Sequence, residues 1–326
     1  MKLIFDRADS PDMYYLCGFH SDVKCLYTET AEERVLYVPG FEYLRAKQEA
    51  KVRVEKLENI NELLASLDGP FIVGPLFAHS LAQQLQGEIT IEQELVPERK
   101  IKTEQEIAAI HEAQRHAAQA IALIEQEVAH STLESGVLVR EGEVVTSEYL
   151  KYVARTYLIE HGYDCPDIIV ASGAHTAQPH NRGSGPIRQG PLIIDCYPQS
   201  TKALYHGDMT RTLIVGEDEN AKRMLDAVRY AHKECVKACI PGVRASDLHE
   251  QCIAILQEAG FETTAQQGMI HSLGHGIGLA IHERPALSPK DDTILAEGMV
   301  VTIEPGLYYD VGVRWEDIVV VGGGIL

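Results

Sequence analysis

Residues 272–285 read SLGHGIGLAIHERP and contain two histidines, His275 and His282, seven positions apart. Glycine occupies positions 274, 276 and 278, so the segment is too glycine-rich to form a regular helix. Zinc-binding helices of the HExxH type place two histidines four residues apart on one helical face. The segment therefore predicts a site that is not helical. If the site binds metal, its other ligands must come from elsewhere in the chain.

Bulk composition restricts the class of protein. A chain of 326 residues with 45% hydrophobic and 24% charged residues fits a soluble globular protein of one large or two ordinary domains. The net charge of −19 argues against binding to nucleic acid or to an anionic membrane. The N-terminus lacks a signal-like apolar core, and no apolar run is long enough to cross a bilayer. Seven cysteines without a CxxC motif predict reduced thiols, and we expect a cytoplasmic protein.

The first hundred residues alternate between strand-like and helix-like segments. This order predicts a small α/β domain over residues 1–100 with parallel strand pairing. The expected strands are 34–39, 51–57, 69–76 and 88–95, and the expected helices are 41–50, 60–67 and 79–86.

A second domain is expected over residues 101–326. Thr103 and Glu106 form a capping-box pattern, and apolar residues then recur at helical spacing to about Val128. The remaining pattern predicts two successive units of two helices and a strand hairpin, which suggests an internally duplicated α+β domain without clear sequence identity between its halves. The further expected helices are 147–161, 219–239 and 246–259, and the expected strands are 167–173, 191–198, 205–215, 299–309 and 313–321.

Acidic residues interrupt the apolar strands of both hairpins. Asp195 follows Leu192, Ile193 and Ile194, a run typical of a buried strand, and a buried carboxylate needs a partner. Two carboxylates from each half plus one histidine can bind a pair of divalent ions. The candidate ligands are Asp195, Asp208, His275, Glu304 and Glu316.

Each of these residues also has a simpler interpretation. A strand aspartate is often a turn or edge residue, Glu316 and Asp317 can be a solvated pair, and His275 can be a hydrogen-bonded core histidine. Their joint occurrence favours the metal site. An oxygen-rich ligand set suits Mn²⁺ or Co²⁺, while Zn²⁺ and Fe²⁺ also fit.

Four segments resemble the signature segments of the creatinase/prolidase/methionine aminopeptidase family, the pita-bread metallopeptidases. They are Asp195 with GDMTRT (207–212), GHGIGLAIHERP (274–285), EGMVVTIEPG (297–306) and GVRWED (312–317). The preceding domain, with YYLCGF (14–19) and ERKIKTEQEI (98–107), resembles the N-terminal domain of Xaa-Pro peptidases. The resemblance implies an α+β pita-bread domain with an internal pseudo-two-fold duplication, preceded by a smaller α/β domain.

The resemblance also implies a role for each matching residue. It makes the five candidate residues ligands of two metal ions in a site for metal-assisted amide hydrolysis, with Glu304 as the proton acceptor. His180, in AQPHNRG, would lie near the substrate and help to transfer protons. His282 would contact the substrate carbonyl, and Arg314 would support the site.

Two departures from the family pattern leave details open. Family members commonly place the two aspartates eleven residues apart, whereas Asp195 and Asp208 are thirteen apart, an insertion that a hairpin tip can absorb. The insertion also leaves His206 on the same strand face as Asp208. Dipeptide-specific relatives often carry an arginine where this chain has Ala286, and Arg284 lies two residues earlier.

The expected substrate is a peptide with proline at its second position, and the sequence fits both an enzyme for dipeptides and one for longer peptides. A methionine aminopeptidase is the main alternative, although such enzymes normally lack a domain like residues 1–100. Creatine hydrolysis on this fold does without metal, and non-catalytic peptide-binding relatives typically lose ligands, so the intact ligand set disfavours both. The resemblance also implies a homodimer.

Overall fold

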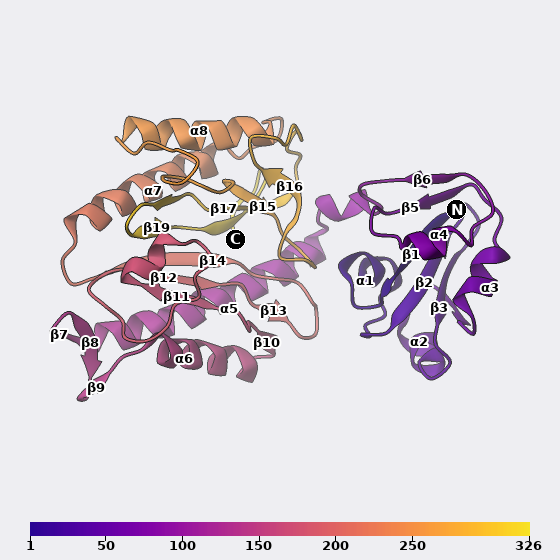
Figure 1. Cartoon of the computed structure of the whole chain (residues 1–326), viewed down its shortest axis with the longest axis horizontal. Helices are drawn as coiled ribbons and strands as arrows, with labels where there is room; N and C mark the ends of the chain where they lie inside the picture. The colour runs from indigo at the N-terminus through magenta and orange to yellow at the C-terminus, as the bar shows by residue number, and fades with distance from the viewer. The chain divides into compact units, whose positions relative to one another are not determined.

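The computed structural model describes residues 1–326, and the chain divides into two compact units, Met1–Arg99 and Lys100–Leu326. Figure 1 labels the elements of both units. No helix is both long enough and apolar enough to span a membrane. All seven cysteines are buried free thiols, as the sequence predicts.

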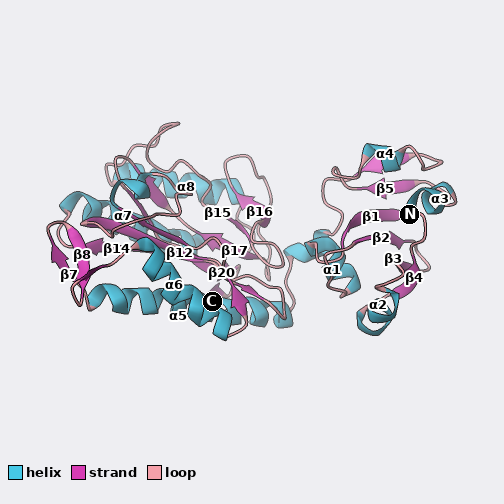
Figure 2. Cartoon of the chain, turned by 60° about the horizontal axis from the view of Figure 1, so that its bottom comes forward, coloured by secondary structure: helices cyan, strands magenta, loops and turns pink.

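The first unit is built on a six-stranded mixed sheet with strand order β4-β3-β2-β1-β5-β6 (Figure 2). The pairs β3–β4, β1–β5 and β5–β6 are parallel, as expected, but β1–β2 and β2–β3 are antiparallel. Its strands are β1 (Lys2–Arg7), β2 (Lys24–Glu29), β3 (Arg34–Val38), β4 (Arg53–Lys56), β5 (Phe71–Val73) and β6 (Ile89–Ile91). Its helices are α1 (Pro11–Cys17), α2 (Tyr43–Glu49), α3 (Ile60–Ala65) and α4 (His79–Ala82).

Both faces of this sheet are packed. Leu3 and Leu26 contribute to one buried cluster, whereas their chain neighbours Ile4 and Tyr27 contribute to another. Since successive strand residues point to opposite faces, each face of the sheet carries its own core. Because both faces are apolar, β1 and β2 lack the alternation of apolar and polar residues that usually indicates a strand in a sequence.

The second unit places two antiparallel sheets between two pairs of helices (Figures 1 and 2). The larger sheets have the strand orders β11-β12-β14 and β16-β15-β17-β20-β21. The helices are α5 (Glu104–Ala129), α6 (Ser147–Glu160), α7 (Glu219–Ala238) and α8 (Ala245–Glu258), and the 3₁₀ helices are Pro97–Lys100 and Gly173–Ala177. The strands of the first half are β7 (Thr132–Glu134), β8 (Val137–Arg140), β9 (Glu143–Val144), β10 (Tyr163–Asp164), β11 (Ile169–Ser172), β12 (Gly190–Cys196), β13 (Gln199–Ser200) and β14 (Met209–Val215). Those of the second half are β15 (Gly274–Gly276), β16 (Glu283–Leu287), β17 (Val300–Ile303), β18 (Gly306–Tyr308), β19 (Gly312–Arg314), β20 (Asp317–Val320) and β21 (Gly324–Ile325).

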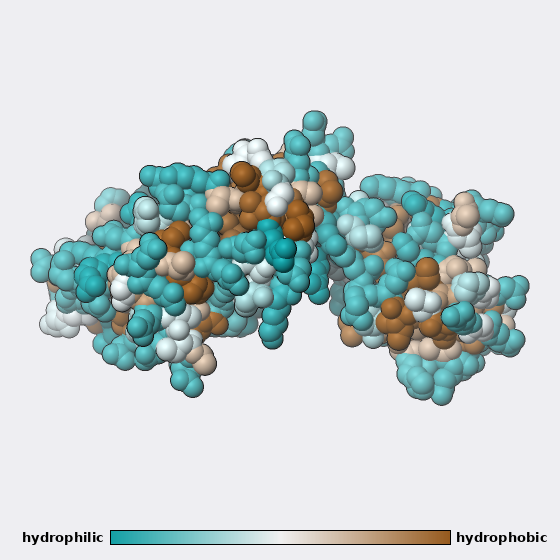
Figure 3. Space-filling model, turned by 90° about the horizontal axis from the view of Figure 1, so that it is seen from above, coloured by the Kyte–Doolittle hydropathy of each residue, from teal (hydrophilic) through white to brown (hydrophobic).

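The two halves of this unit repeat the same order of elements. Helices α5 and α6 precede the three-stranded sheet, and α7 and α8 precede the five-stranded sheet. Each half has its own buried apolar cluster, and the capping box at Thr103 and Glu106 begins α5 as predicted. The surface seen in Figure 3 is mostly hydrophilic, with scattered hydrophobic patches, in keeping with the acidic composition.

Several strands are shorter than the sequence predicts. The segment 299–309 forms two strands, β17 and β18, separated by Glu304 and Pro305, because proline has no N–H for a sheet ladder. The segment 313–321 likewise divides into β19 and β20, and β19 pairs with β18 whereas β20 pairs with β17. Both interruptions fall at candidate ligands, Glu304 and Glu316.

Candidate metal centre

Asp195 lies near the end of β12, a strand whose residues are all buried. Its Oδ2 accepts a hydrogen bond from Arg314 Nη2 at 2.6 Å. Its Oδ1 is buried without any hydrogen-bond partner. A buried carboxylate oxygen without a partner carries a large desolvation cost, which a bound cation would remove.

Asp208 lies one residue before β14 and is 5% exposed. Burial raises its pKa well above the usual range, and the nearby Glu316, Asp195 and Glu304 raise the pKa further. The carboxyl group is therefore held in a position where its ionised form is unfavourable without a positive partner.

His275 in β15 directs one ring nitrogen at the carboxylates. Its Nδ1 lies 3.0 Å from Gly276 O, so this nitrogen carries the proton and Nε2 has a free lone pair. Nε2 lies 3.5 Å from Glu304 Oε1 and 3.7 Å from Asp208 Oδ2. Burial, followed by the charge of His282, lowers the His275 pKa to about 4, which keeps the ring neutral as a metal ligand requires.

Glu316 lies between β19 and β20, and its Oε2 accepts a 2.7 Å hydrogen bond from Thr210 Oγ1. Burial, followed by the charge of Asp195, raises the Glu316 pKa to about 8. Single ligand atoms of Asp208, His275 and Glu316 all lie within 4.8 Å of one another. Burial, followed by the charge of Glu316, also raises the pKa of Glu304 well above its usual range.

The structure thus brings together the five residues that the sequence analysis selected, around one buried cluster. Asp208, His275 and Glu316 form its centre, Glu304 contacts His275, and the charge of Asp195 acts on Asp208. Four carboxylates face one guanidinium in this cluster. This excess of buried negative charge and the unpaired Asp195 oxygen fit divalent cations, for which carboxylate and imidazole are suitable ligands.

Arg314 connects the cluster to its surroundings. In addition to Asp195, its guanidinium donates to Thr210 Oγ1 at 3.1 Å, to Pro179 O at 3.2 Å and to Tyr308 Oη at 3.1 Å. Thr210 also donates to Glu316, so the side chains of Arg314 and Glu316 meet at one hydroxyl group.

The two remaining histidines predicted from the sequence lie at the edge of the cluster. The His282 ring packs edge-on against His275 with centroids 4.3 Å apart. Burial, followed by the charge of His180, lowers the pKa of His282. His180 is exposed, and Pro179 before it is held by Arg314. Both histidines therefore lie beside the candidate ligands.

Two further residues of the site, His271 and Tyr308, do not stand out in the sequence. Tyr308 Oη accepts from Arg314 and lies 3.1 Å from His271 Nε2, and His271 Nδ1 lies 2.7 Å from Ser272 O. Burial, followed by the charge of Arg314, lowers the His271 pKa to about 4. The only signal in the sequence is the position of His271 four residues before His275.

The two additional residues between Asp195 and Asp208 lie in the connection between β12 and β14 and leave the pairing of these strands intact. Asp195 pairs with Thr210 in the β12–β14 ladder, so the additional residues lie in the connection at 197–208. His206 donates its backbone N–H to Gly278 O at 2.9 Å. Its ring is not part of the three-residue centre, and burial lowers its pKa to about 4.

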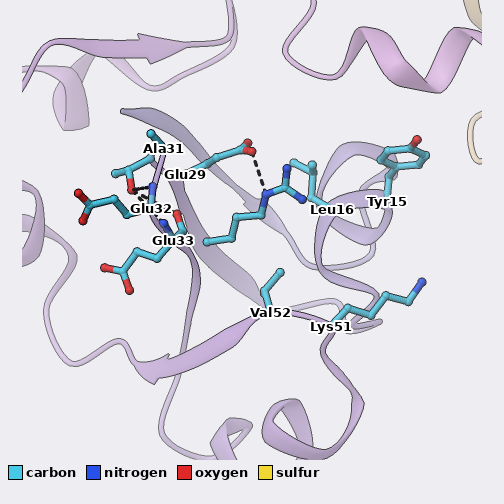
Figure 4. Close-up of a pocket in the computed structure, with 10 residues that line it drawn as sticks. Tyr15, Leu16, Glu29, Ala31, Glu32, Glu33, Lys51 and Val52 are labelled. Carbon is cyan, nitrogen blue, oxygen red and sulfur yellow. Dashed lines mark hydrogen bonds and ion pairs between the residues drawn. The ribbon is translucent and has the colours of Figure 1, made fainter.

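A pocket in the first unit contains none of these residues. It is lined by Tyr15, Leu16, residues 29–34, Lys51 and Val52. Figure 4 shows acidic and basic side chains around it, among them Glu29, Glu33 and Lys51. Arg34 Nε donates to Glu29 Oε1 at 2.9 Å. Some of its charged side chains are paired with one another, so the lining of this pocket does not indicate a particular ligand.

Comparison with known proteins assigns the family. The family described as metallopeptidase family M24 matches residues 108–322, and the creatinase/prolidase N-terminal domain matches residues 3–107. The chain therefore belongs to metallopeptidase family M24 and is a metallopeptidase.

Two relatives and one solved structure match this chain over nearly its whole length. The Xaa-Pro dipeptidase of Pyrococcus furiosus is 35% identical, covering 96% of this chain and 89% of the relative. The Xaa-Pro dipeptidase of Pyrococcus horikoshii is 32% identical, covering 96% and 88%. The crystal structure of the prolidase from Pyrococcus horikoshii matches with a TM-score of 0.86 and 29% identity, covering 100% of this chain and 92% of that chain. These matches confirm the predicted pita-bread fold with its N-terminal domain.

Proposed function

We propose that this enzyme hydrolyses the Xaa-Pro bond of dipeptides at a site that holds two divalent metal ions. The observation that carries the proposal is the buried cluster of four carboxylates and a neutral histidine around a single arginine. The names of the two Pyrococcus relatives, each matched over 96% of this chain, support the choice of substrate. The residues expected to hold the ions are Asp195, Asp208, His275, Glu304 and Glu316.

The ions, when bound, would supply Lewis acidity that acidifies water and polarises the substrate carbonyl. Mn²⁺ or Co²⁺ is the preferred choice for the oxygen-rich ligand set, and Zn²⁺ and Fe²⁺ also fit. The buried Asp195 Oδ1 without a partner supports the presence of a cation at this end of the cluster.

The protein side chains then have separate roles. Glu304, buried and close to His275, accepts the proton of the attacking water and passes it to the leaving proline nitrogen. His282 donates a hydrogen bond to the carbonyl oxygen as negative charge develops there. His180 lies beside the substrate and exchanges protons with solvent. Arg314 orients Asp195 and the backbone before His180.

The test is hydrolysis of Ala-Pro by the Mn²⁺-loaded enzyme, compared with a Glu304→Gln variant. We expect the substitution to lower kcat by about 10²-fold or more because it removes the proton acceptor. Metal content should stay close to that of the unmodified enzyme, because the glutamine keeps a ligand oxygen. Near-normal turnover by Glu304→Gln would contradict the role of Glu304. Two bound Mn²⁺ ions without hydrolysis of any Xaa-Pro peptide would favour a peptide-binding function.

Removal of an N-terminal residue from longer Xaa-Pro peptides is a second candidate, favoured by Ala286 at the position where dipeptide-specific relatives often have an arginine. Ala-Pro-Ala, assayed beside Ala-Pro, distinguishes the two activities. Residues 3–107 match the creatinase/prolidase N-terminal domain, which disfavours a methionine aminopeptidase. We also propose a homodimer, which sedimentation of the purified enzyme would test.

A further inference from the structure

Gln114 is a buried polar residue on the apolar face of α5. Its side chain is 2% exposed, and the neighbouring Ile110, Ala113 and Ala117 on the same face are fully buried. A polar side chain buried among apolar residues destabilises the fold unless its donors and acceptors are paired. The partners of Gln114 therefore indicate why the chain places an amide there.

Both polar atoms of Gln114 bind the backbone of Asp208. Nε2 donates to Asp208 O at 2.9 Å, and Oε1 accepts from Asp208 N at 2.8 Å. The β12–β14 ladder ends at the pair Cys196–Met209, one residue short of Asp208. The side-chain amide of Gln114 thus pairs the Asp208 backbone immediately beyond the point where the strand ladder stops.

The chain before Asp208 also lies directly against α5. A Cβ on Gly207 would come within 2.6 Å of the Ala113 carbonyl carbon and 2.7 Å of the Gln114 nitrogen. Backbone atoms cannot give way as a flexible side chain can, so only glycine permits this close approach. Two independent features, the glycine and the amide, therefore fix Asp208 relative to the helix.

We propose that Gln114 is a positioning residue for the metal centre: by holding both backbone groups of Asp208, it preorganises that carboxylate for metal binding. The inference rests on the metal site proposed above. The carboxylates of the cluster repel one another in the absence of a cation, so a ligand with a mobile backbone would move away from Glu316 and Asp195. Fixing the backbone removes that freedom before the metal binds.

The test compares Mn²⁺ affinity in the full-length enzyme and in Gln114→Met, which keeps a similar volume but cannot pair with Asp208. We expect the Kd for Mn²⁺ to rise about tenfold or more, the effect typical of losing an outer partner of a metal ligand. Isothermal titration with MnCl₂ measures the Kd. Fluorescence of Trp315, the single tryptophan of the chain and the neighbour of Glu316, reports binding independently.

Ile124→Val is the matched control, since Ile124 is buried in the same helix but belongs to the apolar cluster. It should lower the melting temperature of the metal-free protein without changing the Kd. Gln114→Asn keeps an amide one methylene shorter, and its Kd should also rise; it replaces Gln114→Met if that variant does not fold. The inference would be overturned if the Kd for Mn²⁺ of Gln114→Met and Gln114→Asn stayed within twofold of the Kd of the unmodified enzyme. It would also be overturned if Ile124→Val raised the Kd as much as these variants do. If the unmodified enzyme binds no Mn²⁺, the proposed metal site itself fails, and the role of Gln114 fails with it.

Discussion

Arg314 shows how a single residue can organise a site assembled from distant segments. Its guanidinium contacts Asp195 and Thr210 of the first half and Pro179 beside His180, and it also reaches Tyr308 of its own hairpin. Arginine suits this position because its planar group offers five donors in fixed directions. A lysine would retain the charge but could not reach these acceptors together.

We expect Arg284 to be the residue that binds the free carboxylate of a dipeptide substrate. It begins the segment after His282 and Glu283, and its side chain is 66% exposed. Its contact with Asp291 is a single ion pair of 3.4 Å, and Asp291 is independently satisfied by Thr293 and the Ala286 N–H. Because Arg284 is exposed and the buried Asp291 keeps these other partners, we expect the ion pair to contribute only about 1 kcal/mol and Arg284 to be available to a substrate carboxylate.

We therefore expect Arg284→Ala to raise the KM for Ala-Pro about tenfold, as for the loss of one charged hydrogen bond. Ala-Pro-amide is the matched substrate, because it lacks the free carboxylate and should show the same KM with either enzyme. Steady-state kinetics with both substrates measures the difference. Equal changes in KM for the two substrates would show that Arg284 does not bind the carboxylate.

The candidate carboxylate ligands could be predicted from the sequence because they place a charge in or beside a strand that is otherwise apolar. Asp195 after three aliphatic residues is the plainest case. His271 and Gln114 could not be found in this way, because their importance comes from partners 37 and 94 residues away. A sequence pattern records local periodicity, whereas these contacts exist only after the sheets have packed.

At the scale of elements, the start of α5 holds the loop that carries His282. Lys102, immediately before the α5 cap, donates to Glu283 Oε2 at 2.8 Å, and the two side chains are only 2% and 5% exposed. Glu283 Oε1 accepts from Ala280 N at 2.9 Å, which closes the turn between Gly278 and Glu283. A Cβ on Gly278 would lie 2.9 Å from this oxygen, so the carboxylate packs directly against the glycine.

Removing one partner of this buried pair should be more harmful than neutralising both. We expect Lys102→Met to lower the free energy of unfolding by about 3–5 kcal/mol, because the buried Glu283 carboxylate then loses the ammonium group of Lys102. The double variant Lys102→Met/Glu283→Gln should be more stable than Lys102→Met alone. Urea unfolding of the two single variants and the double variant gives the coupling energy. Additive losses would show that the two side chains do not act as a pair.

The strand ends illustrate why element boundaries were harder to predict than elements. The helices α5 to α8 lie close to the predicted ranges, since each has a long apolar period and most begin at a capping residue. The segments 299–309 and 313–321 were each predicted as one strand but form two. Apolar residues stand on both sides of each interruption, so the apolar pattern alone does not show where the ladder ends.

At the scale of the whole molecule, the buried carboxylate cluster makes the stability of the metal-free protein depend on pH. The pKa of Glu316 is raised to about 8, and those of Asp208 and Glu304 are raised well above their usual ranges. A carboxyl group with a raised pKa binds more protons in the folded state than in the unfolded state. Stability therefore falls as pH rises toward the folded pKa. The buried histidines His206, His271 and His275, with pKa values of about 4, act in the opposite direction, but only below their unfolded pKa of 6.5.

Well above pH 6.5 the histidines are neutral in the unfolded state as well, so up to about pH 8 only the carboxylate effect remains, which gives a prediction with a definite sign. The melting temperature of the EDTA-treated protein should fall across this interval, because Glu316 and its neighbours must ionise in a buried, negatively charged site. Saturating Mn²⁺ should reverse the slope, since metal binding favours the ionised ligands and stabilises the folded state by mass action. Differential scanning calorimetry at several pH values, with and without Mn²⁺, measures both slopes. A metal-free protein whose stability is constant or rises over this interval would show that the carboxylates are not held together before the metal binds.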